Sequence, residues 1–165
     1  MNWDPFLVCQ PNENPPKPRD IHSQEGLGDR MRSAAFAELQ ATRAFEWASE
    51  HFNDVPQELK DDWVRLSKVE QEHLDAILNR MDELGISLTE KPVSSRLWDS
   101  LMQCKTGKEF CLFISSAEER GRQAGVKLCQ FIKKKDPVTA AVFEKIVEEE
   151  VEHIALAEKY YGWKP

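Results

Sequence analysis

The sequence lacks the features that would place it in several other classes of protein. No apolar run approaches the roughly 18 residues that a membrane-spanning helix needs. The first ten residues, MNWDPFLVCQ, contain no basic segment followed by an apolar one, so they do not resemble a secretion signal. Flavin and nicotinamide fingerprints are also absent. The first two absences predict a cytoplasmic protein with no membrane partner.

Cysteine is scarce, and no two cysteines stand in a Cys-x-x-Cys pattern. The four cysteines are Cys9, Cys104, Cys111 and Cys129. Their spacing excludes a rubredoxin-type iron module and a thiolate zinc knuckle. It favours reduced, buried thiols.

The composition is that of one globular domain with an acidic balance. The chain has 165 residues, of which 41% are hydrophobic and 31% are charged, and its net charge is −7. This length and balance are typical of a single folded domain. The negative charge argues against broad, sequence-independent nucleic-acid binding, so we expect no DNA partner.

Proline divides the chain into two parts. Five of the nine prolines lie within the first 18 residues, where no helical period is visible. We therefore expect an extended N-terminal arm over residues 1–29 and a helical bundle over residues 30–163.

Apolar residues in the second part recur at spacings of three and four, the period of an amphipathic helix, and no strand pattern competes. The long connection over residues 86–106 predicts a crossover between the second and third long helices, with a short helix around residues 94–104. The predicted fold is all-α, with four long helices at residues 30–52, 57–84, 107–134 and 137–160.

The inner, apolar stripe of every predicted long helix contains ionisable residues. Such groups on apolar faces are very costly unless they are paired or bound to metal. The six residues are Glu38, Glu70, His73, Glu118, Glu150 and His153.

These six residues repeat with a fixed offset along the chain. The two glutamates of each half are 32 residues apart, and each histidine follows its glutamate by three. An offset of this kind indicates an internal duplication of a helical hairpin. Adding 80 to a position in the first half pairs Glu38 with Glu118, Glu70 with Glu150, and His73 with His153.

Coordination chemistry explains the spacing. Residues i and i+3 of a helix point the same way, so a Glu-x-x-His pair can hold one metal ion. Two such pairs, with one glutamate from each remaining helix, are the arrangement of ferritin-like di-iron and di-manganese bundles. The four carboxylates would balance two divalent ions. Mixed carboxylate and imidazole ligands suit two iron ions, with manganese or zinc possible. We expect no catalytic residue beyond this metal centre.

Several residues near this set have two interpretations. Glu118 follows the stripe that contains Ile114, whereas Glu119 aligns with Ser115 and Arg122 on a face predicted to be solvated. The period and the offset both favour Glu118. The whole set also has a second interpretation, as a polar network inside a bundle that binds no metal.

Two small residues lie one helical turn after Glu38 and Glu118. Thr42 follows Glu38, and its hydroxyl either bonds a ligand or bonds back to the helix backbone. Gly121 follows Glu118, and it either leaves space for a substrate or lets two helices pack closely.

A basic stripe runs through the third long helix. Eight of residues 105–135 are lysine or arginine, opposed by three glutamates. This stripe is either a solvated face or a docking patch for RNA or another anionic partner.

At its metal-ligand motifs the sequence resembles the ferritin-like superfamily, and in particular a bacterial family of uncharacterised ferritin-like proteins related to the MiaE-type tRNA hydroxylases. The resemblance covers about residues 30–163. In that family the third motif typically reads Glu-Ala-Arg-Gly, which again points to Glu118, although Glu119 stands here where alanine is usual. The motifs that carry the resemblance lie at residues 37–41, 70–73, 118–121 and 150–153.

The resemblance implies a di-iron centre in a four-helix bundle and, for the MiaE branch, oxygen-dependent hydroxylation of a modified tRNA base. The functional prediction is an O2-dependent oxidoreductase, a hydroxylase or monooxygenase, with an external electron donor and an unidentified organic substrate, tRNA being possible. The alternatives are a ferroxidase or iron-handling protein and a non-catalytic metal-binding protein. Nothing in the sequence indicates a storage cage, so we expect a monomer or small homo-oligomer.

Overall fold

The computed structural model describes residues 1–10 and 13–164. Five helices make up the fold: α1 (Gln24–His51), α2 (Gln57–Glu83), α3 (Arg96–Leu101), α4 (Gly107–Ile132) and α5 (Pro137–Tyr161). The prediction of an all-α fold is confirmed. Apart from one isolated bridge, the described residues form no strand pairing.

The long helices begin and end within two residues of the predicted positions, except at the start of α1. Helix α1 begins at Gln24, six residues before the predicted start, because Ser23 caps it by accepting a hydrogen bond from the backbone N–H of Gly26. At the other end of the chain, the predicted start of α5 is confirmed. Asp136 caps that helix, and Pro137 occupies its first turn, where a missing N–H costs nothing.

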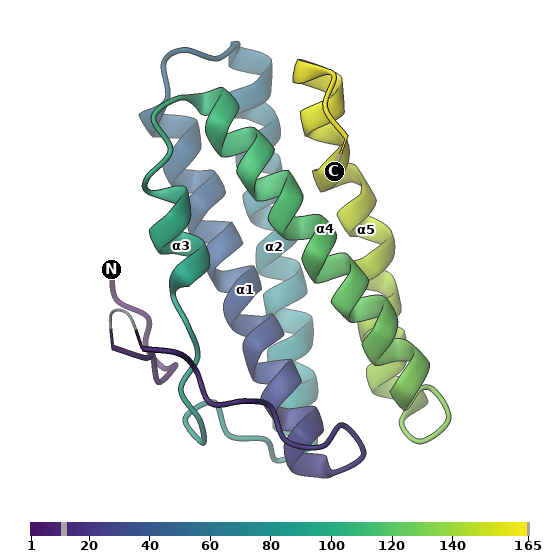
Figure 1. Cartoon of the computed structure of the whole chain (residues 1–165). Coiled ribbons are helices and arrows are strands. Elements are labelled where there is room, and N and C mark those ends of the chain that lie inside the picture. The colour runs from purple at the N-terminus through teal and green to yellow at the C-terminus, as the bar shows by residue number, and fades with distance from the viewer. Residues whose placement is uncertain (11–12, 165) are drawn as a thin grey trace.

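The four long helices pack as two antiparallel pairs, α1 with α2 and α4 with α5 (Figure 1). This pairing is consistent with a four-helix bundle. The connection between the pairs contains α3, which lies beside α1. Helix α1 runs from the lower to the upper end of the bundle in Figure 1, and α4 runs in the opposite direction.

The hydrophobic core has two parts, and the predicted ionisable residues lie between them along every long helix. One apolar cluster includes Phe36 of α1 and Ile77 of α2, towards the end where α1 begins. The other includes Phe45 of α1 and Trp63 of α2, towards the opposite end. On α1, for example, Glu38 falls between Phe36 and Phe45. The cluster of charged groups is therefore sealed by apolar residues above and below.

The N-terminal segment packs against the bundle through aromatic contacts. The rings of Trp3 and Phe6 lie 5.3 and 5.1 Å from the ring of Phe36. A backbone bridge joins Val8 to Val93 in the connection between α2 and α4. The division at residue 29 stays a prediction. No helix in the described parts of the chain is long and apolar enough to cross a membrane.

Candidate metal centre

All six predicted residues are buried in the middle of the bundle. None of them is more than 9% exposed. Their elements differ: α1 contributes one glutamate, α4 another, and α2 and α5 each contribute a Glu-x-x-His pair. The four long helices therefore all present a carboxylate to one interior region. We call the set Glu38, Glu70, His73, Glu118, Glu150 and His153 the carboxylate–histidine cluster.

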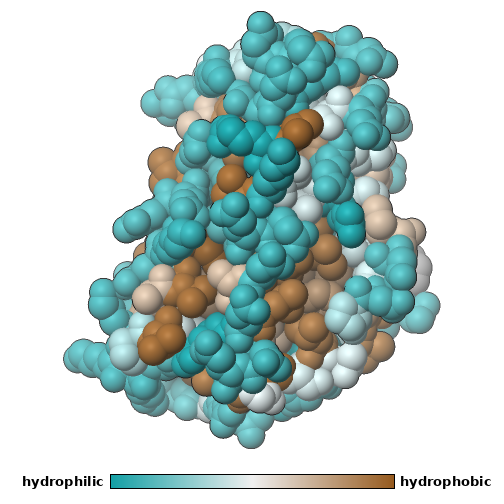
Figure 2. Space-filling view, turned by 180° about the vertical axis from the view of Figure 1, so that it is seen from behind, coloured by the Kyte–Doolittle hydropathy of each residue, from teal (hydrophilic) through white to brown (hydrophobic). Residues whose placement is uncertain are grey.

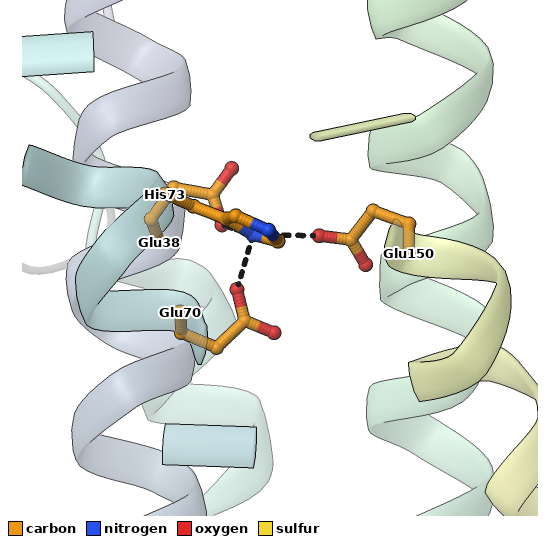
Figure 3. Close-up of side chains that lie close together, drawn as sticks. All are labelled: Glu38, Glu70, His73 and Glu150. Atoms are coloured by element: carbon orange, nitrogen blue, oxygen red, sulfur yellow. Dashed lines mark ion pairs between the residues drawn. The ribbon is translucent and has the colours of Figure 1, made fainter. Parts of the chain in front are cut away.

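Four members of this cluster come close enough to share one metal ion. Glu38, Glu70, His73 and Glu150 each offer a ligand atom, and these atoms all lie within 4.8 Å of one another. Figure 3 shows the imidazole of His73 directed between the carboxylates. Its Nδ1 lies 3.4 Å from an oxygen of Glu70 and 3.5 Å from an oxygen of Glu150.

His153 of α5 has the equivalent position relative to the same two glutamates, Glu70 and Glu150. Its Nδ1 lies 2.6 Å from an oxygen of Glu70 and 3.3 Å from an oxygen of Glu150. The rings of His73 and His153 stack, with centroids 5.6 Å apart and planes inclined by 22°. Each histidine thus approaches the glutamate of its own helix and the glutamate of the partner helix. This reciprocal geometry agrees with the offset of 80 residues in the sequence.

The structure separates the two adjacent glutamates of α4. Glu118 is buried, whereas Glu119 forms a two-pronged ion pair with Arg122 at 2.7 and 3.0 Å. One expectation about this face is wrong. Ser115 is buried rather than solvated, because it lies three residues before Glu118 and shares its inward direction.

The buried ligand atoms approach one another closely, but these contacts do not have the angles of hydrogen bonds. Within the described part of the chain, no partner is found for either oxygen of Glu70, for one oxygen each of Glu118 and Glu150, or for Nδ1 of His73 and His153. An unsatisfied buried polar group costs about 1–3 kcal/mol. Divalent cations would satisfy all these atoms together, and four carboxylates with two imidazoles form a donor set suited to iron or manganese. The residues present therefore fit a metal site.

The pKa values show how strongly the carboxylates act on one another. Burial, and then the charge of Glu70, raise the pKa of Glu38 well above its usual range. Burial, and then the charges of Glu150 and Glu70, do the same to the pKa of Glu118. Both carboxyl groups therefore keep their protons to higher pH than a free glutamate when no cation balances them.

The same carboxylates favour the protonated, charged form of the two histidines. Burial alone would lower their pKa values, but the carboxylates of Glu150 and Glu70 outweigh it and raise the pKa of His73 to about 10 and of His153 to about 9. Burial alone would raise the pKa of Glu70, yet the two imidazoles hold it at about 2. Protons thus take the place of cations in this cluster.

Three further polar residues at the cluster were not predicted as site residues from the sequence. Glu149 accepts a hydrogen bond of 2.9 Å at Nε2 of His73, which leaves Nδ1 directed at the carboxylates. Thr42 and Ser115 are buried, and their hydroxyl oxygens have no partner among the described residues. The backbone bond considered for Thr42 is therefore absent. Of the three, only Thr42 was considered as a possible partner of a ligand, from its one-turn spacing after Glu38.

A groove of about 620 Å³ leads to the cluster between α1 and α4. Its lining includes Glu38, Glu118 and Glu150, together with small apolar residues of both helices. We call it the α1–α4 groove. A solute that entered it would meet three of the six cluster residues.

The opposite side of the molecule also has apolar surface. Figure 2 shows hydrophobic residues gathered in the lower half of the rear face, between more hydrophilic areas. A second groove, of about 560 Å³, is lined by Ala76 of α2 and by Val138 and Ala141 of α5. His73 is the one cluster residue in its lining.

The fold and the site define an all-helical protein with a buried carboxylate–histidine cluster, consistent with a ferritin-like di-metal site. The chain belongs to the family described as "Protein of unknown function (DUF455)", whose profile matches residues 4–164. A comparison with curated proteins finds no match.

Proposed function

We propose that this protein is a non-haem di-iron oxidoreductase that uses O2, most simply as a hydroxylase or monooxygenase. The observation that supports this proposal is the coincidence of two features. One is a set of buried ligand atoms without hydrogen-bond partners, and the other is a groove that connects three of the same carboxylates to the surface. A purely structural metal site has no need of such a groove.

The six cluster residues would hold the metals in two equivalent sets. Glu70 and His73 of α2, with Glu150 and His153 of α5, supply the two Glu-x-x-His pairs, and Glu38 and Glu118 complete the ligands. Two bound iron ions would supply the activation of O2 and the oxidation of an organic substrate, with electrons from an external donor.

The protein's own residues perform three tasks in this proposal. The apolar clusters above and below the site exclude water, so the charges act in a region of low polarity. Glu149 fixes the orientation of the His73 ring through its hydrogen bond. The carboxyl groups of Glu38 and Glu118, both in the lining of the α1–α4 groove, can hold or release protons beside an entering substrate.

The proposal is tested by metal content and by the reaction of the ferrous protein with air. We expect about two iron ions per chain after anaerobic loading, and near-ultraviolet absorption that develops when air is admitted. Glu118→Gln should weaken iron binding, whereas the matched control Glu119→Gln changes the neighbouring surface residue and should behave as the unaltered protein. Failure to hold two ions, or binding of iron with no reaction in air, would contradict the proposal.

The alternative functions make different predictions. A ferroxidase that stores iron would assemble into a cage and elute from gel filtration far above a dimer. Action on tRNA would require salt-dependent RNA binding through the basic stripe. Charge reversal of residues 133–135 should weaken that binding, although Lys133 already pairs with Glu144 at 2.7 Å. A non-catalytic metal-binding protein would bind iron without consuming O2.

A further inference from the structure

The α1–α4 groove is bordered by small side chains where larger ones would close it. Ala34 and Ala37 of α1 and Ala117 and Gly121 of α4 are all part of the lining. Glycine is among the least favourable residues in a helix interior, so its presence there calls for a reason. A Cβ atom added to Gly121 would meet nothing within 4 Å. Close packing of helices, one of the two explanations offered by the sequence, is therefore not the reason at Gly121.

The neighbouring glycine of the same helix gives the contrast. A Cβ atom added to Gly125 would lie 2.7 Å from a methyl group of Val147 on α5. Gly125 thus permits the close approach of α4 and α5. Gly121, one turn away, instead keeps open the part of the groove next to Glu118.

The groove has two cations that no carboxylate neutralises. Within the described residues, neither Arg30 nor Lys127 forms an ion pair, and both are in the groove lining. The guanidinium of Arg30 is held in place by hydrogen bonds to the backbone carbonyls of Arg19 and Gly26, at 2.9 and 2.7 Å. The third cation of the lining, Arg122, already pairs with Glu119.

These two cations lie at the same end of the groove. Arg30 precedes Glu38 by eight residues, which is about 12 Å along α1, and Lys127 follows Glu118 by nine, about 14 Å along α4. Because α1 and α4 run in opposite directions, both cations lie towards the lower end of the bundle in Figure 1. The groove therefore has positive charge at one end, apolar walls along its length and carboxylates at the other end.

We propose that the α1–α4 groove binds a small amphipathic anion, with its acidic headgroup at Arg30 and Lys127 and its apolar chain directed towards the carboxylate–histidine cluster. The reverse orientation would bury the charged headgroup beside Glu38, Glu118 and Glu150, where the described lining of the groove offers no unpaired lysine or arginine to balance it. The second groove, between α2 and α5, is less suited to bind an anion. Its one lysine, Lys145, pairs with Glu149 at 3.6 Å. The identification of this ligand as the substrate rests on the proposed function, whereas its binding does not.

Calorimetric titration of the metal-free protein tests the binding. The probes are dodecanoate, dodecyl phosphate and neutral dodecanol, which share a chain and differ in headgroup. We expect both anions to bind about tenfold more tightly than dodecanol, since a hydrogen bond to a charged group is worth about that factor. The two anions distinguish a carboxylate from a phosphate headgroup as the preferred ligand. Equal affinity for dodecanol and the anions would overturn the proposal.

Two sets of variants locate the site. Arg30→Gln with Lys127→Gln should reduce dodecanoate affinity about tenfold and leave dodecanol affinity unchanged, while the control Lys134→Gln should change neither. Gly121→Leu should abolish binding of every probe, and Gln123→Leu, which adds the same side chain to an exposed position of the same helix, should not. Normal binding by a folded Gly121→Leu would overturn the proposal. Should that variant not fold, the paired cation variant decides in its place.

The failure of this inference is distinguishable from failure of the proposed function. A protein that holds two iron ions and reacts with air, but binds dodecanoate no better than dodecanol, would overturn the ligand and leave the oxidoreductase. A protein that binds dodecanoate in the groove but never reacts with air would overturn the oxidoreductase and leave the ligand site.

Discussion

The molecule contains two clusters of charged residues with buried carboxylates, and they are neutralised in different ways. In the first, at the beginning of α1, Asp29 contacts Arg19 at 2.6 Å, Arg32 at 3.2 Å and Lys91 at 3.2 Å. Glu90 contacts the same two arginines at 2.7 and 2.9 Å. Three cations thus accompany two carboxylates, and the protein supplies all of them. We call this the Asp29 cluster.

The carboxylate–histidine cluster has no such cations. Among the described residues, no lysine or arginine forms an ion pair with any of its members. Its four carboxylates are balanced only by protons on the imidazoles and on the carboxyl groups themselves. Burying charge is costly in both places. The protein's own cations thus neutralise the Asp29 cluster, whereas the carboxylate–histidine cluster has no such cation among the described residues.

The largest effect on stability should come from breaking the Asp29 cluster. Asp29→Asn removes the carboxylate that the three cations share and leaves the buried Arg32 with one fewer partner. Loss of one member of a buried ion pair costs about 3–5 kcal/mol in free energy of unfolding. Denaturant unfolding should show a loss in this range, and a loss below about 1 kcal/mol would contradict the structural role.

The two clusters should also respond to pH with opposite signs. The cations, Arg19 first, hold the pKa of Asp29 well below its usual value of 3.8, so its contribution is present above that pH and is lost as pH falls. The imidazoles of His73 and His153 have raised pKa values, so their contribution is complete below pH 6.5 and is lost as pH rises towards about 9 to 10. The raised pKa values of Glu38 and Glu118 act in the same direction.

We therefore expect the metal-free protein to lose at least about 2 kcal/mol of stability between pH 6.5 and 10. Thermal unfolding followed by circular dichroism measures this. Zinc, which needs no exclusion of air, should abolish the loss, because metal binding favours the deprotonated ligands. A stability that is flat over this range without metal would show that the cluster does not hold the protons assigned to it.

Glu149 offers a smaller effect on metal affinity. Its hydrogen bond orients the His73 ring, and loss of such a partner typically weakens metal binding by about 10- to 100-fold. Glu149→Gln should reduce iron affinity by about tenfold, measured by competition with a chelator. Glu148→Gln, at the adjacent position, is the control. Equal effects of the two substitutions would mean that the hydrogen bond has no part in metal binding.

The smallest effect on stability is expected for Glu118→Gln in the carboxylate–histidine cluster. Burial and the neighbouring carboxylates raise the pKa of Glu118 well above its usual range, so Glu118→Gln removes a charge that the metal-free fold disfavours and keeps a side chain of similar shape. We expect the unfolding free energy of the metal-free protein to change by less than about 1 kcal/mol or to increase. A loss as large as that of Asp29→Asn would show that the carboxylate is needed for folding and not for a cation.

The positions of the long helices and the six cluster residues were predictable from the sequence, because both depend on local periodicity. Helix positions follow from the spacing of apolar residues, and the six cluster residues follow from ionisable side chains on those apolar stripes. The early start of α1 escaped prediction because the turn after Ser23 is polar and carries no apolar period. Glu149 escaped because its role depends on the orientation of the His73 ring, which the helical period does not determine.

The Asp29 cluster and the α1–α4 groove depend on tertiary structure instead. Arg19 and Lys91 reach Asp29 from segments 10 and 62 residues away, and no local pattern records that meeting. The open space beside Gly121 belongs to a groove that helices from different halves of the chain line together. The sequence alone is compatible with both explanations of this glycine.

The central claim is that the carboxylate–histidine cluster is a site for two divalent cations. Anaerobic titration of the metal-free protein with ferrous iron, with proton release recorded in a weakly buffered solution at pH 7, tests it most directly. We expect two ions per chain and the release of at least about two protons, from the imidazoles of His73 and His153, whose pKa values are raised to about 10 and about 9. Binding of fewer than two ions, or of two ions without proton release, would contradict this claim.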